Sequence, residues 1–166
     1  MMPYIMKAAV YTLKEHPVFN SSIQNNATNI VFKKYYHIGV AVDTKDGLVV
    51  PVIKDVDKKN IEELSKELMV ISDKARNKKL TPADLKGGTF TISNLGGIGG
   101  SFFTPIINPP EVAILGVSRM KSEEVNKKKL TLPLSLSYDH RVVDGAAGAA
   151  FMVSLSSFLN NPQKLK

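Results

Sequence analysis

One short segment near the C-terminus gathers residues that could perform acid–base chemistry. Between Ser137 and Gly145, His140 has an acidic and a basic neighbour, and Asp144 follows four residues later. A histidine side chain ordinarily titrates with a pKa of about 6.5, which suits removal of a proton from a thiol whose pKa is about 8.5. A lone histidine beside charged residues also serves structure, so the pattern alone leaves both interpretations open.

A second candidate region is the glycine-rich stretch that follows Ser93. Residues 95–100 contain neither the Lys-Ser/Thr ending of a P-loop nor the Gly-x-Gly-x-x-Gly spacing that precedes a helix. We therefore favour a tight turn that lets two backbones approach closely over a nucleotide-binding loop. Ser93 could act as a hydrogen-bond donor at an active site, or it could bond to its own backbone at a strand end.

Composition excludes several kinds of chemistry. The chain has no cysteine, so any thiol chemistry must use thiols carried by substrates. We expect no metal, because His16 and His37 have no partner at metal-binding spacing. The net charge of +7 comes mostly from scattered lysine runs without interleaved arginine and aromatic residues, which argues against a nucleic-acid partner. No segment approaches the about 20 apolar residues of a membrane span, and no signal peptide is evident, so we expect a soluble, unexported chain with no membrane partner.

These residues must be positioned by a mixture of helices and strands. Periodicity and capping signals predict helices over residues 3–15, over 60–77 with a capping box of Asn60 and Glu63, and from Asp144 onward. The last helix should turn these residues inward: Ala146, Ala147, Ala150, Val153 and Leu155. Strands are predicted over 29–32, 37–42, 48–53, 89–93, 112–117 and 130–138.

The order of these elements indicates the fold class. A polar loop is expected around Asn25 and Asn26, a hairpin should join 37–42 to 48–53, and Pro51 should lie at an edge or bulge. Because the strands do not alternate strictly with helices, we expect one α+β domain with a mixed-sheet sandwich.

Five ordered motifs resemble the catalytic domain of the acyltransferases of 2-oxo acid dehydrogenase complexes, a family related in fold to chloramphenicol acetyltransferase. They lie at residues 14–22, 36–53, 87–96, 103–116 and 134–146. The last motif, around His140, is the most specific, and together the motifs extend over nearly the whole chain. Residues 94–100 and 110–118 are more similar to the acetyl-transferring members of pyruvate dehydrogenase complexes than to the succinyl-transferring ones.

The resemblance implies a role for each candidate residue. His140 would take the proton from an attacking thiol, and Ser93 would donate a hydrogen bond to the oxyanion of the tetrahedral intermediate. Asp144, where family members carry Asp or Asn, would orient and cap the following helix. The substrates would be coenzyme A and an acyl-dihydrolipoyl group on a domain absent from this chain.

The resemblance also implies an assembly. Family members form trimers in which His and Ser come from adjacent subunits, and the trimers work with lipoyl domains, a thiamine-dependent decarboxylase and dihydrolipoyl dehydrogenase. The expected location is the cytoplasm in a bacterium, or the mitochondrial matrix in a eukaryote.

This chain departs from the family pattern in two places. The family's catalytic domain normally begins with an arm, a helix and a strand, so we expect residues 1–166 to be that domain without its first part, and without lipoyl or subunit-binding domains. The segment 121–129 is shorter than the usual hairpin. Two alternatives stay open: a structural core that assembles without turnover, and a free-standing acyltransferase that uses another acceptor.

Overall fold

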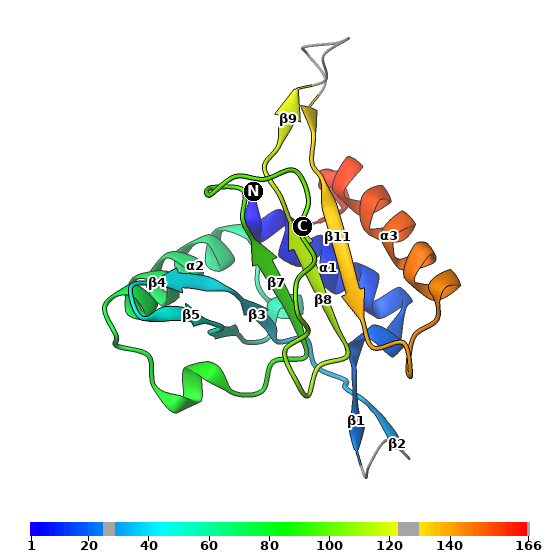
Figure 1. The fold of residues 1–166 in the computed structure, drawn as a ribbon, viewed down its shortest axis with the longest axis horizontal. Coiled ribbons are helices and arrows are strands. Elements are labelled where there is room, and N and C mark those ends of the chain that lie inside the picture. Colours follow the sequence, from blue (N-terminus) through cyan, green and yellow to red (C-terminus); the bar gives the residue numbers. More distant parts are fainter. Residues whose placement is uncertain (25–28, 123–129, 166) are drawn as a thin grey trace.

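A computed structural model describes residues 1–24, 29–122 and 130–165. Within these residues, a five-stranded mixed sheet has the strand order β11-β8-β7-β3-β6 (Figure 1). The sheet strands are β3 (Ile38–Val40), β6 (Val52–Ile53), β7 (Phe90–Asn94), β8 (Ala113–Val117) and β11 (Leu134–Tyr138). The helices are α1 (Met2–Glu15), α2 (Ile61–Arg76) and α3 (Gly145–Asn160), and the 3-10 turns are Pro17–Asn20, Val56–Lys58, Pro82–Leu85 and Pro162–Lys164.

The sheet combines parallel and antiparallel pairs. Strands β3, β7 and β8 run parallel to one another, while β6 and β11 pair antiparallel at the two edges. Three two-stranded hairpins lie outside this sheet: β1 (Ser21–Gln24) with β2 (Asn29–Phe32), β4 (Val42–Thr44) with β5 (Gly47–Val49), and β9 (Lys121–Ser122) with β10 (Leu130–Thr131). The expected α+β fold with a mixed sheet is confirmed.

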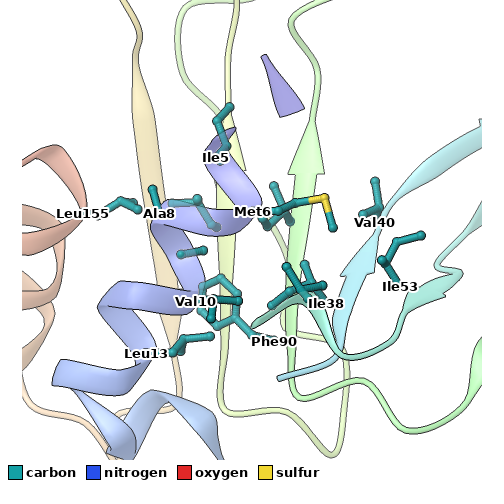
Figure 2. Close-up of a cluster of buried hydrophobic side chains, with 14 of the residues drawn as sticks. Ile5, Met6, Ala8, Val10, Leu13, Ile38, Val40, Ile53, Phe90 and Leu155 are labelled. Atoms are coloured by element: carbon teal, nitrogen blue, oxygen red, sulfur yellow. The ribbon is translucent and has the colours of Figure 1, made fainter. Parts of the chain in front are cut away.

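Helix α1 crosses one face of the sheet and forms the centre of the core. Its residues Ile5, Met6 and Val10 are almost completely buried, and they pack with strand residues such as Ile38 and Phe90 (Figure 2). Side chains alternate between the two faces of a strand, so the residues next to these core positions point to the other face. On this other face of the sheet, β7 carries Thr91 and Ser93, and β11 carries Ser135 and Ser137.

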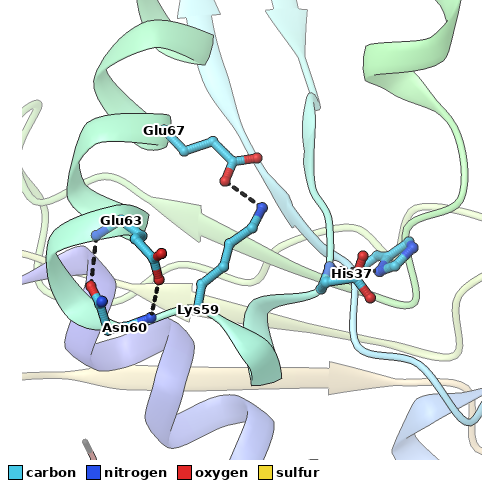
Figure 3. A network of polar contacts seen from close by, with 6 residues as sticks. His37, Lys59, Asn60, Glu63 and Glu67 are labelled. Carbon is cyan, nitrogen blue, oxygen red and sulfur yellow. Dashed lines mark hydrogen bonds and ion pairs between the residues drawn. The ribbon is translucent and has the colours of Figure 1, made fainter.

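Helix α2 begins as its capping residues predict. The Asn60 side chain accepts a hydrogen bond from the Glu63 amide at 2.9 Å, and the Glu63 carboxylate accepts one from the Asn60 amide at 2.8 Å (Figure 3). An ion pair between Lys59 and Glu67 lies beside this cap. Because a capping box satisfies donors that a helix start leaves free, this boundary is readable from local sequence.

The start of α3 was predicted correctly, and its buried face was predicted in part. Of the expected inward residues, Leu155 is buried and Ala147 packs against the core, whereas Ala146 and Ala150 are exposed and Val153 is 70% exposed. Gly148 and Phe151, which we did not name, are also buried. Phe151 determines this orientation because its ring packs 4.4 Å, centroid to centroid, from the ring of Phe19 in the 3-10 turn that follows α1. The small residues buried too little area to compete with one aromatic side chain.

Two strand predictions needed correction. Strand β2 pairs with β1, which we did not predict, and this hairpin extends away from the sheet (Figure 1). The predicted hairpin between residues 37–42 and 48–53 is confirmed: Val42 pairs with Val49 and Ile38 with Ile53, and the ladder is interrupted at Pro51, next to the edge strand β6. The expected strand over 130–138 is broken at Pro133. Asn25, Asn26 and residues 123–129 lie outside the described residues.

Candidate active site

His140 lies at the exposed apex of a turn that joins β11 to α3. The turn is organised by Asp139, whose carboxylate accepts hydrogen bonds from Arg141 Nη2 at 2.6 Å and from the Arg141 amide at 3.0 Å. The amide of Asp139 donates to the carbonyl of Val112, the residue before β8. These bonds from Arg141 lower the pKa of Asp139, so the carboxylate stays ionised and keeps the turn in place.

Asp144 begins the helix that follows this turn. Its carboxylate accepts a hydrogen bond of 2.8 Å from the Ala147 amide, so the predicted capping role is observed. One turn into the helix, Gly148 makes room for the ring of Tyr138, two residues before His140. A Cβ at position 148 would lie 2.8 Å from the Tyr138 ring, so only glycine permits this approach.

Ser93 is the fourth residue of β7 and points away from the α1 core. It is 9% exposed. Its hydroxyl has no hydrogen-bond partner among the described residues, so the alternative in which it bonds to its own backbone is not observed there. The hydroxyl is therefore available to donate to a substrate oxygen.

A single chain does not bring Ser93 and His140 together. In the register of the sheet, Ser93 on β7 pairs with Gly116 on β8, and Gly116 pairs in turn with Ser135 on β11. His140 lies five residues beyond Ser135, which corresponds to roughly 17 Å along a strand. The carboxyl ends of β7 and β11 point in opposite directions (Figure 1). The two residues thus lie toward opposite ends of the sheet.

A cavity of about 670 Å³ opens at the carboxyl ends of β3 and β7, on the face of the sheet that α2 covers and opposite the face toward which Ser93 points. Its walls include Val40 and Asn94 from these strands, Met69 and Arg76 from α2, and Ile98 from the glycine-rich loop. Its volume falls in the range of small-molecule sites, and the carboxyl ends of parallel strands are common places for them. A cavity of about 710 Å³ near Tyr4 and Leu132 is lined by none of the predicted site residues.

The glycine-rich stretch forms the predicted turn, and the predicted close approach of a second backbone occurs at Gly96. The amides of Ile98 and Gly99 both donate to the Leu95 carbonyl at 3.0 Å, and the Gly96 amide donates to the Asn94 side chain. These bonds occupy amides that a phosphate-binding loop would present to its ligand. A Cβ at Gly96 would lie 3.4 Å from the Ser118 carbonyl oxygen and 3.8 Å from Arg119 Cα, whereas a Cβ at Gly97, Gly99 or Gly100 would have no other atom within 4 Å.

The remaining histidines make polar contacts with residues that are distant in the sequence. His16 Nε2 lies 2.9 Å from the Ser154 hydroxyl, and His37 Nδ1 accepts a hydrogen bond from the Asp55 amide. Among the residues that the structure describes, no group of three or more metal-ligating side chains comes together, and no helix is long and apolar enough to cross a membrane.

Two polar residues near the site were not singled out from the sequence. Glu111 is buried and accepts a hydrogen bond from Thr91 on β7. Burial raises the pKa of Glu111 to about 7. Arg119, just after β8, donates to two carbonyls of the glycine-rich loop. Glu111 could have been found from the sequence, because it is a glutamate inside the otherwise apolar run 109–117. No local pattern marked Arg119.

A match to a known protein family shows which family this chain belongs to. The family model described as 2-oxoacid dehydrogenases acyltransferase (catalytic domain) matches residues 1–166. The chain belongs to this family.

Named relatives are similar over nearly all of the chain. The dihydrolipoyllysine-residue acetyltransferase component of the pyruvate dehydrogenase complex from Haemophilus influenzae is 57% identical over 98% of this chain and 30% of the relative. The corresponding component from Buchnera aphidicola of Acyrthosiphon pisum is 52% identical over 97% of this chain and 42% of the relative. The chain therefore spans less than half the length of these relatives.

Solved structures agree in fold. A structure of Azotobacter vinelandii dihydrolipoamide acetyltransferase superposes with a TM-score of 0.94 at 50% identity, covering 99% of this chain and 70% of that one. A chloramphenicol acetyltransferase superposes with a TM-score of 0.66 at 15% identity, over 95% of this chain and 77% of that one, and it supports the fold alone.

Proposed function

We propose that this chain transfers an acyl group, acetyl in the first instance, from an acyl-dihydrolipoyl thioester to coenzyme A. The observation that carries the proposal is that the chain presents an exposed His140 on a turn held by Asp139 and, separately, a Ser93 hydroxyl that has no hydrogen-bond partner among the described residues. The Azotobacter vinelandii structure comes from work on a serine, a histidine and an asparagine in the catalytic mechanism of that enzyme. Its histidine and asparagine are four residues apart, as His140 and Asp144 are here.

In this mechanism His140 removes the proton from the coenzyme A thiol. The resulting sulfur nucleophile adds to the thioester carbonyl, and the oxyanion of the tetrahedral intermediate accepts a hydrogen bond from Ser93. When the intermediate collapses, the bond from the carbonyl carbon to the dihydrolipoyl sulfur breaks, and protonated His140 returns the proton to that sulfur. One oxyanion donor stabilises the transition state of other enzymes by about 3–4 kcal/mol.

The site is completed by a second subunit. Since Ser93 and His140 lie apart in one chain, each must meet its counterpart on a neighbour, and a trimer in which every chain supplies both residues satisfies this requirement. Exposed apolar residues on the loop before β8 provide a surface for such contact, since Phe102 is 73% exposed and Ile106 is 90% exposed. A relative with a TM-score of 0.94 forms the cubic core of the pyruvate dehydrogenase multienzyme complex.

We expect coenzyme A to lie between subunits, on the face of the sheet toward which Ser93 points. The cavity of about 670 Å³ lies on the opposite, helix-covered face, and it is lined by the carboxylates of Asp43 and Asp73 beside a single cation, Arg76, which does not suit the phosphates of coenzyme A. The dihydrolipoyl group would arrive from a lipoyl domain, and the acyl group from a thiamine-dependent decarboxylase. Dihydrolipoyl dehydrogenase would then reoxidise the lipoyl group, in the cytoplasm of a bacterium or the mitochondrial matrix.

The test measures acetyl transfer between acetyl-coenzyme A and dihydrolipoamide, together with sedimentation. We expect a trimer or a multiple of three that turns over, and a decrease in turnover by roughly 10²–10⁴ in His140→Ala with folding intact. Turnover of His140→Ala within twofold of the parent would remove His140 from the mechanism. A stable trimer without any transfer would instead support the structural-core alternative, and transfer to other acceptors only would support a free-standing acyltransferase.

A further inference from the structure

Gly116 leaves a gap on the face of the sheet toward which Ser93 points, and the ring of Phe103 fills this gap. Gly116 on β8 pairs with Ser93 on β7, and both positions point away from the core that α1 covers. A Cβ on Gly116 would lie 3.0 Å from Phe103 Cζ and 3.2 Å from Phe103 Cε1. Since neighbouring strands lie about 4.8 Å apart, the edge of the aromatic ring occupies the strand position directly beside Ser93.

A hydrogen bond holds Phe103 in this place. The Ser135 hydroxyl on β11 donates to the Phe103 carbonyl at 2.6 Å. Ser93, Gly116 and Ser135 form one row across three strands, so the loop that carries Phe103 crosses the sheet at the level of Ser93. A Cβ on Gly116 would also clash with the Ser135 hydroxyl, so a side chain at position 116 would displace the ring, the hydroxyl or both.

The ring therefore lies close to any carbonyl that binds the Ser93 hydroxyl. On the same face of β7, the neighbouring side chain is Thr91, whose hydroxyl already donates to Glu111. Phe103 is the apolar group that adjoins Ser93 on the β8 side, and it is partly exposed, so its side chain can contact a ligand.

We propose that Phe103 is a specificity-determining residue that limits the length of the acyl group held at Ser93, and that Ser135 positions it. This inference rests on the proposed function, which places a thioester carbonyl at Ser93. A two-carbon acyl group ends before the ring, whereas a four-carbon chain meets the aromatic edge. In apolar pockets of other enzymes, one methylene group changes selectivity by about 10–200-fold.

The experiment compares acetyl-coenzyme A and butyryl-coenzyme A as acyl donors to dihydrolipoamide. The full chain is tested beside Phe103→Ala, Phe103→Leu and Ser135→Ala. The control is Met69→Ala, because Met69 is an apolar residue of α2 that is 72% exposed on the opposite side of the sheet. For each protein we measure kcat and KM with both donors, the Kd of both donors by calorimetry, the free energy of unfolding and the sedimentation coefficient.

We expect the parent to prefer the acetyl donor, and Phe103→Ala to reduce this preference in kcat/KM by at least about tenfold. Transfer of butyryl should become faster and its donor should bind more tightly, because the obstructing ring is gone. Phe103→Leu should have an intermediate preference. Ser135→Ala should shift the preference in the same direction by about fivefold, which corresponds to the loss of one hydrogen bond. Met69→Ala should keep the parental preference.

Three results would overturn the inference. The first is a parent that accepts both donors equally, and the second is an unchanged preference in a folded Phe103→Ala that sediments like the parent. The third is an equal loss of acetyl and butyryl transfer together with lower stability, which would mean that Phe103 only packs beneath its loop.

Phe103→Leu decides the question by the same ratio if Phe103→Ala does not fold. If the parent transferred neither acyl group, the proposed function would fail, while the Kd values of the two donors in the parent and in the Phe103 variants would still decide whether Phe103 selects the acyl group.

Discussion

The Thr91 hydroxyl donates a hydrogen bond of 2.6 Å to the buried carboxyl of Glu111, and this contact joins β7 to the segment before β8. The position is tightly enclosed, because a Cβ on Gly88 would lie 2.7 Å from the other carboxyl oxygen. On its open side, Lys33 and Lys86 line a small cavity that also reaches Glu111. A carboxyl enclosed in this way is more stable neutral than ionised.

This environment makes stability depend on pH. Burial raises the pKa of Glu111 from 4.5 to about 7, so its contribution to stability is fully present below about pH 4.5 and is lost as pH rises toward 7. The loss is on the order of 3 kcal/mol in the free energy of unfolding. Glu111→Gln cannot ionise, and we expect denaturant titrations of this variant to lack that slope. If the free energy of unfolding changed equally with pH in the parent and in Glu111→Gln, the ionisation of Glu111 would not lower stability.

Contacts such as the hydrogen bond between Thr91 and Glu111 could not be predicted from the sequence. The helices α1 and α2 were predicted because apolar periodicity and the Asn60 cap are local signals. Thr91 and Glu111 are 20 residues apart, and no periodicity links a buried acid to its donor. Arg119 meets Gly96 across 23 residues for the same reason.

The errors in the fold have a similar origin. Strand β1 is polar and short, and it exists as a strand because it pairs with β2, which is a tertiary rather than a local signal. The face of α3 depended on which residue met Phe19, and a run of small residues gave no preference. For the site, the motif around His140 indicated which residues matter, but the separation of Ser93 from His140 required the strand pairing.

Substitutions of Asp144 separate its role as a helix cap from a role of its negative charge in the reaction. Asp144→Asn keeps a side-chain oxygen for the Ala147 amide, so we expect stability and turnover close to the parent. Asp144→Ala removes the cap and should lower the free energy of unfolding by about 0.5–2 kcal/mol. Urea denaturation and turnover assays measure the two effects. A large loss of turnover in Asp144→Asn with unchanged stability would assign the negative charge a role in the reaction.

Gly148 links the packing of α3 to the position of His140. Gly148→Ala places a methyl group 2.8 Å from the Tyr138 ring, so the ring or the helix must move. We expect a loss of about 1–3 kcal/mol in stability from overpacking, and reduced turnover because Tyr138 precedes the His140 turn.

Gly145→Ala is the matched control for this change. It lies in the same helix, but the added Cβ would be at an ordinary 3.9 Å from the nearest neighbouring atom, the Tyr138 hydroxyl oxygen. Thermal unfolding and turnover should therefore differ little from the parent in Gly145→Ala. Equal effects of the two substitutions on both measurements would exclude the Tyr138 contact as the cause.

Sharing of the site between subunits can be tested by mixing two inactive variants. Chains with Ser93→Ala keep His140, and chains with His140→Ala keep Ser93, so a mixed trimer contains interfaces at which both intact residues meet. With equal amounts and random assembly, half of the sites have an intact His and half of those have an intact Ser, which gives about one quarter of parental activity.

The mixture must exchange subunits, so the two chains are refolded together and the turnover of the mixture is compared with that of each variant refolded alone. The control combines His140→Ala with the double variant Ser93→Ala/His140→Ala, in which every His140 is absent and no interface can recover. We expect recovery in the first mixture only, because the strand pairing keeps Ser93 and His140 of one chain apart. If tagged chains prove that mixed trimers formed and activity still stays at the level of the separate variants, then both residues act within one chain, and the shared site is wrong.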